Sequence, residues 1–175
     1  RQNFMLYTSA ESSLPNDERG RRNYRDAFTK EHWNGLEFIE AKGDRGGCQT
    51  LQQLMGPRPI ANNMSLGWKT TSVPTMEAVE MYYTKNGLPW EDDPETKDID
   101  PLAYNKAAGT VEMHLHKEPR FYASVGYDRG TYRFNGGKMT IKAHKGEPQG
   151  FTGSYDNEYQ SYNGYFCQKW VLSLI

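Results

Sequence analysis

Aromatic side chains set in polar loops are the residues of this chain whose type and setting best suit ligand chemistry. A pyranose offers its C–H faces to a flat ring and its hydroxyls to nearby amides and carboxylates. Trp33 lies beside Asn34, and Trp68 lies beside Lys69 and near two further amides. The candidate binding residues are Trp33, Asn62, Asn63, Trp68, Trp90, Tyr155 and Tyr159. For each Trp, the alternative is that the ring packs its loop onto the core.

Catalytic chemistry has no comparable support. Glycoside hydrolysis needs two carboxylates close together in space. Glu37 and Glu40 lie three residues apart on an expected short strand, so their side chains point to opposite faces. The chain contains no Gly-x-Ser-x-Gly, P-loop or Gly-x-Gly-x-x-Gly motif. The sequence therefore predicts a protein that is not an enzyme and needs no cofactor.

The sequence gives little support for a metal site. His114 and His116 lie two residues apart in an alternating run, so on a strand they share one face. No third ligand stands at a spacing typical of a metal site, and we interpret the pair as part of an exposed polar strand face. The acidic loop 91–100 lacks the order of a calcium loop. Cys48 and Cys167 match no metal spacing and form either one disulfide or two separate thiols.

The composition narrows the classes of partner. The 175 residues suffice for one domain. The mean hydropathy of −0.89 is low for such a domain and indicates long ordered loops or reliance on a neighbouring part. A net charge of −1 gives no field that favours nucleic acid or an anionic membrane. No apolar run approaches the roughly 18 residues of a transmembrane helix.

Residues 1–35 are polar, and we expect them to be loop-like, with the mixed-charge run 17–26 as a solvated surface. A short strand is predicted over 36–41, followed by a long irregular stretch over 43–73. The next segment, 74–86, is predicted to be a capped helix.

This helix has signals at both ends. Thr75 can cap its N-terminus, and Asn86-Gly87 supplies a left-handed stop. The apolar positions at helical spacing, which we expect to be buried, are Met76, Val79 and Tyr83.

From residue 110 the hydrophobic period changes to two, which predicts strands over 110–116 and 121–127. Asn135-Gly136 between two alternating runs predicts a β-hairpin, because both central residues of a type I′ turn need positive φ. The remaining predictions are hairpin strands over 131–134 and 138–144, a loop over 151–164 and a packed segment over 165–175.

Two segments also carry a resemblance to a known family. Residues 74–89 read PTMEAVEMYYTKNGLP, and residues 117–127 read KEPRFYASVGY. They resemble the paired signatures of the SusD/RagB family, the surface glycan-binding lipoproteins of Bacteroides-type bacteria. The resemblance extends from about residue 30 to about residue 170 and is weaker outside the two signatures.

The resemblance implies an α+β fold with long irregular loops, the non-repeat portion of a mainly helical protein, with residues 1–175 as a single region. Family members are longer and carry a lipidated N-terminal Cys and tetratricopeptide-like helices, so we expect this chain to be an internal piece. The implied function is non-catalytic capture of oligosaccharides or polysaccharides such as starch at the outward face of the outer membrane. The partner is a SusC-like TonB-dependent β-barrel transporter, and membrane association comes only from the lipid anchor.

The second signature is expected to be structural, through Glu118, Pro119, Arg120 and Phe121. Arg120 can bind carbonyls or a carboxylate with its rigid fork, and Phe121 can enter the core. Lys117 stands where the family usually has Arg, which puts that residue's bidentate contact in doubt. Ligand-binding aromatics of the family lie in variable loops, so the motif assigns no binding residue.

Three alternatives remain open. The first is a peptide- or protein-binding uptake lipoprotein of the same family, which deep pockets in place of flat aromatic platforms would indicate. The second is a fragment of a carbohydrate-active enzyme, which a close carboxylate pair in a cleft would indicate. The third is a structural surface fragment without a ligand.

Overall fold

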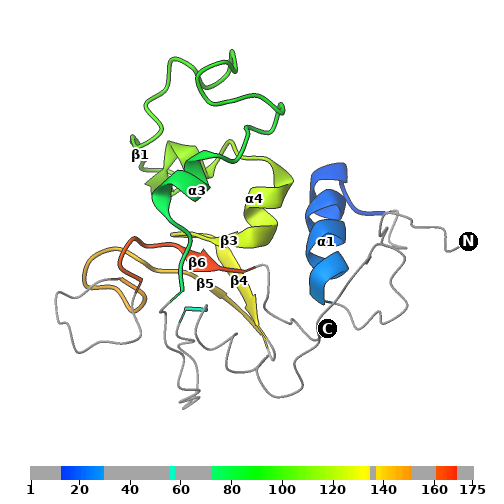
Figure 1. Cartoon of the computed structure of the whole chain (residues 1–175). Helices are drawn as coiled ribbons and strands as arrows, with labels where there is room; N and C mark the ends of the chain where they lie inside the picture. The colour runs from blue at the N-terminus through cyan, green and yellow to red at the C-terminus, as the bar shows by residue number, and fades with distance from the viewer. Residues whose placement is uncertain (1–12, 30–55, 58–71, 135–136, 151–160, 169–175) are drawn as a thin grey trace, which may run out of the picture.

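The computed structural model describes residues 13–29, 56–57, 72–134, 137–150 and 161–168. Within them, short helices and short strands are joined by long connections, a mixed α and β structure as expected (Figure 1). The helices are α1 Asn16–Thr29, α3 Met76–Glu80, the 3₁₀ helix η1 Glu112–His114 and α4 Pro119–Ser124. The strands are β1 Tyr104–Asn105, β2 Thr110–Val111, β3 Val125–Gly126, β4 Thr131–Phe134, β5 Gly137–Thr140 and β6 Phe166–Cys167. They form three antiparallel pairs, β1–β2, β3–β6 and β4–β5.

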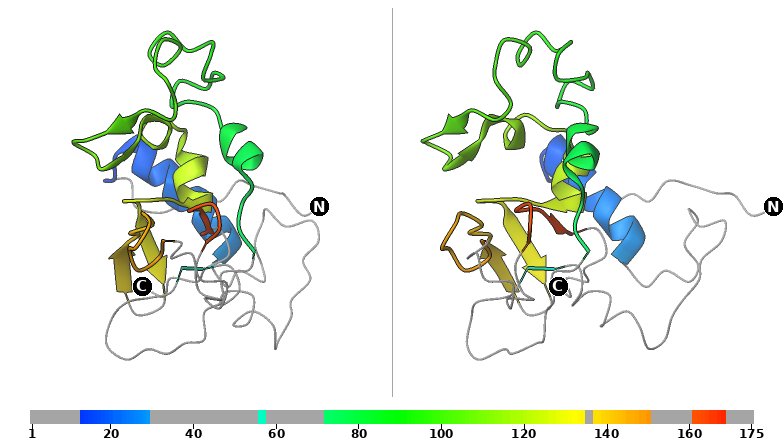
Figure 2. Two further views of the ribbon diagram at one scale, coloured as in Figure 1. Left: turned by 90° about the vertical axis from the view of Figure 1, so that its left-hand side faces the viewer. Right: turned by 60° about the vertical axis from the view of Figure 1, so that its left-hand side comes forward.

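Helix α1 occupies a region that we predicted to be a loop, so that prediction is wrong over its 14 residues. It packs against α4, and Figures 1 and 2 show the two helices side by side. Its buried side chains include Arg25 and Asp26, whose charged groups lie 3.0 Å apart. The prediction that the mixed-charge run 17–26 is a solvated surface is therefore wrong for Arg25 and Asp26. Because part of the buried side is charged, the helix shows no apolar periodicity in the sequence.

Helix α3 begins as predicted and ends early. The Thr75 side chain accepts a hydrogen bond from the Ala78 N–H at 3.2 Å, which confirms the N-cap. Val79 is fully buried as predicted, and Met76 is only partly buried against the same core. Tyr83 is 46% exposed, so the prediction of a buried Tyr83 is wrong. The helix stops at Glu80 because the following residues leave its axis to pair with a distant segment. Gly87 takes the expected positive φ of 76° in the turn that follows.

The hairpin is confirmed by the pairing of β4 with β5, in which Phe134 faces Gly137 and Thr131 faces Thr140. The turn residues 135–136 lie outside the described residues, and the second strand ends at residue 140 instead of 144. Tyr132 from β4 is fully buried against Ile141 and Phe166, which makes the first core cluster.

The two strands predicted over 110–116 and 121–127 are wrong for most of their length. The first shrinks to β2 and continues as η1. The second begins as helix α4 and reaches strand geometry only at β3. Pro119 occupies the first turn of α4, where its fixed φ and missing N–H are tolerated. Alternation of apolar and polar residues over a short segment does not distinguish a strand from a short helix when either would be partly buried.

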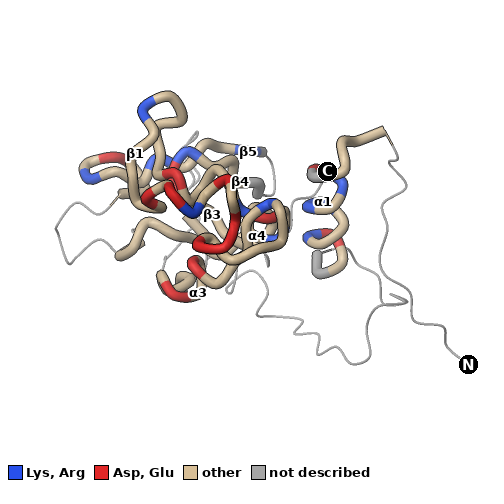
Figure 3. The backbone as a smooth tube through the Cα atoms, turned by 90° about the horizontal axis from the view of Figure 1, so that it is seen from above, with Lys and Arg blue, Asp and Glu red and all other residues tan. Residues whose placement is uncertain are grey.

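A second core cluster joins the two signature segments. Its buried members are Val79, Met113, Phe121, Val125 and Tyr165. Tyr165 and the neighbouring Phe166 are buried, which confirms packing for the described start of the C-terminal segment. Figure 3 shows basic and acidic positions spread over the described backbone, with only acidic ones on α3. Among the described residues, no helix is long and apolar enough to cross a membrane.

Candidate functional site

The two signature segments meet in a hydrogen-bonded frame. Thr84 and Lys117 form an antiparallel bridge. The Lys85 N–H donates to the His116 carbonyl at 2.8 Å, and the Glu118 N–H donates to the Tyr83 carbonyl at 3.0 Å. Backbone bonds therefore hold the first signature against the second.

Lys117 is buried within this frame. Its Nζ donates to the Tyr82 carbonyl at 2.7 Å and to the Glu80 carbonyl at 3.2 Å. These carbonyls belong to the end of α3 and the residues after it, where cations are favoured. Burial lowers the pKa of the Lys117 ammonium. Lys117 thus binds two carbonyls, although an ammonium lacks the rigid fork of a guanidinium.

Glu118 and Arg120 form a bidentate pair. Arg120 Nε donates to Glu118 Oε2 and Arg120 Nη2 donates to Glu118 Oε1, both at 2.8 Å. Glu118 Oε1 also accepts from the Tyr83 N–H at 3.3 Å. The hydrogen bond to Glu118 raises the pKa of Arg120. Phe121 is fully buried. These contacts support the structural role expected of the signature.

Two cavities flank the frame. One of about 410 Å³ lies between α3 and α4 and is lined in part by Tyr82, Glu118 and Arg120. Another of about 470 Å³ lies between α1 and the start of α4, with Lys117 and Tyr122 in its wall. The frame residues therefore border open space on both sides.

The acidic loop is tied to the first signature through Asp93. The buried Asp93 carboxylate accepts hydrogen bonds from the Thr84 hydroxyl, from Asn86 Nδ2 and from the Glu95 N–H. The bond from Thr84 is the main reason that the pKa of Asp93 is lowered. Lys85 pairs with Glu95 at 2.6 Å. In the part of the chain that the structure describes, no group of three or more ligating side chains is placed to hold a metal.

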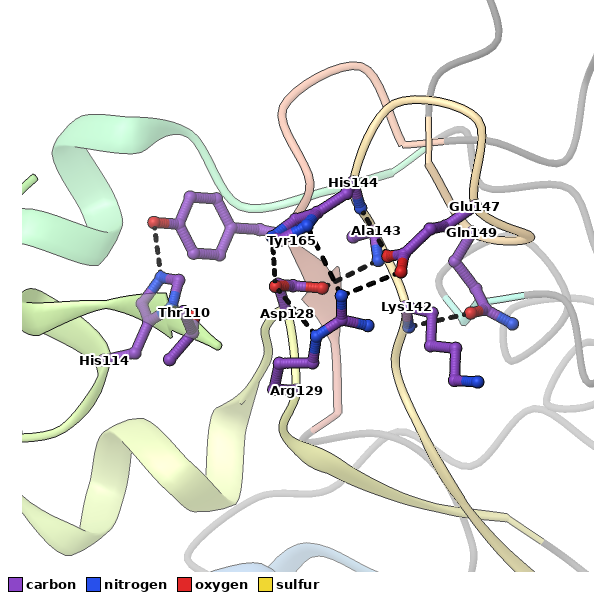
Figure 4. Close-up of polar contacts among 10 residues, drawn as sticks. All are labelled: Thr110, His114, Asp128, Arg129, Lys142, Ala143, His144, Glu147, Gln149 and Tyr165. Atoms are coloured by element: carbon purple, nitrogen blue, oxygen red, sulfur yellow. Dashed lines mark hydrogen bonds and ion pairs between the residues drawn. The ribbon is translucent and has the colours of Figure 1, made fainter. Parts of the chain in front are cut away.

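His114 does not lie on an exposed strand face, so that interpretation is wrong. The turn of η1 points it inward, where Nδ1 lies 2.6 Å from the Thr110 hydroxyl and Nε2 lies 2.9 Å from the Tyr165 hydroxyl (Figure 4). Burial, with repulsion from Lys117, lowers the pKa of His114 from 6.5 to about 4. His116 lies elsewhere, 3.4 Å from Glu112.

A second polar cluster lies at the end of β5 and the turn after β3 (Figure 4). Arg129 Nη2 donates to Glu147 Oε1 at 2.8 Å, and His144 Nε2 lies 2.8 Å from Asp128 Oδ2. The second Asp128 oxygen accepts the Ala143 N–H at 2.8 Å. Sequence reasoning did not select this cluster. Its one local signal is the turn triplet Asp128-Arg129-Gly130 between two alternating runs.

Trp90 is the one sequence-predicted aromatic candidate whose contacts are described. Its Nε1 donates to the Ile99 carbonyl at 3.0 Å, and its ring meets the His116 ring edge-on at 5.9 Å between centroids. The Lys117 ammonium lies 6.0 Å from the Trp90 ring centroid. These are the contacts of a loop packed onto the core. The other candidates lie outside the described residues: Trp33, Asn62, Asn63, Trp68, Tyr155 and Tyr159, as do Glu37, Glu40 and Cys48.

The polar groups of the signature frame bond the backbone and one another, so the frame is a structural scaffold. The family model described as the SusD family matches residues 36–173. The chain therefore belongs to the SusD family, and the resemblance seen in the two signatures is confirmed. Members of this family are generally non-catalytic binders of glycans and nutrients, work with outer-membrane transporters and associate with the cell surface.

Solved structures support the fold. A selenomethionine form of BT4246 matches with a TM-score of 0.66 and 20% identity, over 97% of this chain and 30% of that chain. A further structure of BT4246 matches with a TM-score of 0.66 and 21% identity over the same shares. The chain thus spans under a third of the length of these similar proteins, and at this identity the likeness shows the fold alone. A comparison with curated proteins finds no match.

Proposed function

We propose that this chain is part of a protein that captures oligosaccharides or polysaccharides at the bacterial cell surface without cleaving them. The captured glycan passes to a SusC-like TonB-dependent transporter in the outer membrane. The observation that carries the proposal is the match to the SusD family over residues 36–173. A lipid anchor on the full-length protein holds it at the outward face of the membrane.

The geometry of the frame supports a binding role for residues outside the signatures. The Lys117 ammonium donates to backbone carbonyls, and the Arg120 guanidinium donates to the Glu118 carboxylate. Ligand contacts therefore fall to the loops. We assign them first to Trp33 and Trp68 as stacking platforms. Trp90 ranks below these two, since its indole N–H is already bonded to a carbonyl. The remaining proposed ligand residues are Asn62, Asn63, Tyr155 and Tyr159.

The test is a glycan array followed by calorimetry on the full-length protein. Stacking on one sugar contributes about 1 kcal/mol, so Trp33→Ala or Trp68→Ala should each weaken binding several-fold. The double variant should nearly abolish binding. Leu102→Ala, at a position that is 57% exposed, is the control and should leave affinity unchanged. Binding of peptides with no glycan bound would point to the peptide-uptake members of the family instead.

A further inference from the structure

An exposed aromatic pair lies beside the polar cluster of Asp128, Arg129, His144 and Glu147. Tyr104 is 53% exposed, and its ring centroid lies 5.8 Å from that of His144 at an interplanar angle of 55°. The His144 side chain is itself 43% exposed. Neither ring belongs to either core cluster of the described residues. The pair is therefore partly open to solvent and lies outside both core clusters.

Both rings are held in place by their own turns. Tyr104 pairs with Val111 in the β1–β2 hairpin. Asn105 closes that hairpin, because its side chain accepts the Ala107 and Ala108 N–H groups at 3.0 Å each. On the other side, the His144 N–H donates to Glu147 Oε2 at 3.0 Å, and the ring is fixed by Asp128. A ligand would find the surface already ordered, which lowers the entropic cost of binding.

Arg129 links the two turns. It is the one non-glycine residue with positive φ among those described, at 65°, a conformation that L side chains disfavour. Its Nη2 bonds Glu147 at 2.8 Å and lies 3.4 Å from His144 Nδ1. Its side chain also lies against the β1–β2 turn, where a Cβ on Gly109 would come within 3.5 Å of Arg129 Cγ. Gly or Asn would relieve the backbone, so the Arg side chain itself is what this position needs.

We propose that Tyr104 and His144, with Arg129 and Glu147 at their edge, form a subsite for one neutral hexose unit of a glycan. This rests on the glycan-binding function proposed above and assigns it a place in the described part of the chain. The Tyr104 ring stacks on the C–H face of the sugar. At the edge of that ring a sugar hydroxyl donates to the Glu147 carboxylate, whose two oxygens each accept one described hydrogen bond and keep further lone pairs.

The charges in the cluster define the class of sugar. Arg129 already faces two carboxylates, Glu147 at 2.8 Å and Asp128 at 3.7 Å. With two carboxylates facing one guanidinium, the charges described in the cluster repel the carboxylate or sulfate of an acidic sugar. Lys106 and Lys145 are exposed on the flanking turns. A neutral hexose therefore fits better than a uronate or a sulfated unit.

The experiment measures affinity of the full-length protein for neutral amylopectin, α-mannan and xyloglucan, and for acidic polygalacturonate and heparin. Tyr104→Ala should weaken binding of a neutral polysaccharide about five-fold, and Tyr104→Phe should keep it, since stacking needs the ring alone. Tyr83→Ala is the matched control, because Tyr83 is 46% exposed and lies away from the cluster on the first signature. It should leave affinity unchanged.

The outcomes separate the two proposals. Equal affinity of wild type, Tyr104→Ala and Tyr83→Ala for a bound neutral polysaccharide would overturn the subsite and leave the general function standing. Loss confined to the acidic polysaccharides in Tyr104→Ala would overturn the neutral-sugar class. A wild-type protein that binds a glycan on the array but no neutral polysaccharide would overturn the subsite alone, and one that binds no glycan at all would overturn the proposed function with it.

Discussion

At the scale of single residues, His114 makes the folded state sensitive to acid. Its pKa is lowered from 6.5 to about 4 by burial, so the unfolded chain takes up the proton first. The His114 contribution is fully present above pH 6.5 and is lost as the pH falls from 6.5 toward 4. The loss should reach about 3 kcal/mol at the lower end. Urea unfolding at several pH values measures it.

His114→Gln provides the control for that pH dependence. Gln can still hydrogen-bond Thr110 or Tyr165 but does not titrate, so the stability of this variant should fall less steeply over the same pH range. An identical pH slope in wild type and variant would show that other groups account for the acid sensitivity.

Lys117 offers a second test at this scale. Lys117→Ala removes the donor from two carbonyls in the frame, those of Glu80 and Tyr82. We expect a loss of about 1–3 kcal/mol in the free energy of unfolding, because two partly buried carbonyls lose the ammonium that bonds them. Lys117→Arg, the residue usual in the family, should cost less. Wild-type stability in Lys117→Ala, measured by urea titration, would contradict the role assigned to the ammonium.

At the scale of elements, two glycines predict opposite effects of the same substitution. A Cβ on Gly126 in β3 would come within 2.9 Å of Ile141 Cδ1 and 3.0 Å of Tyr132 Cδ2. Gly126→Ala should therefore destabilise the fold by about 1–3 kcal/mol. On α1, a Cβ on Gly20 meets nothing closer than Pro119 Cβ at 3.9 Å.

Gly20→Ala should accordingly stabilise the protein by about 0.5–1 kcal/mol, because Ala restricts the unfolded chain and favours helix. The two melting temperatures, measured side by side, should move in opposite directions. A stabilising Gly126→Ala would mean that β3 does not pack closely on the hairpin.

The elements that could be predicted from sequence are those with local chemical signals. Asn135-Gly136 marked the hairpin, and the hydroxyl of Thr75 marked the start of α3. Helix α1 could not be predicted because Arg25 and Asp26 lie on its buried side in place of apolar residues. The two signature segments, 74–89 and 117–127, could be recognised in the sequence, and they form the hydrogen-bonded frame. The contact of Arg129 with Glu147, 18 positions away, leaves no periodic trace in the sequence.

At the scale of the whole molecule, the family assignment leads to a prediction about catalysis. The full-length protein should release no reducing ends from the polysaccharides that it binds, because its family captures glycans without cleaving them. A reducing-sugar assay on purified protein over many hours checks this. Activity that copurifies with the protein and is lost on substitution of its own carboxylates would contradict it.

The bridge between Thr84 and Lys117 has a consequence for how such proteins diversify. It closes the base of a long excursion, which Figures 1 and 2 show projecting from the helices, and the β1–β2 hairpin with Tyr104 lies within that excursion. Because the entropy of closing a loop changes slowly with its length, the exposed turns of the excursion can be lengthened while its stem stays shut and Met113 stays in the core. The Thr84–Lys117 bridge thus separates the part of the excursion whose length can vary from the core that must stay constant.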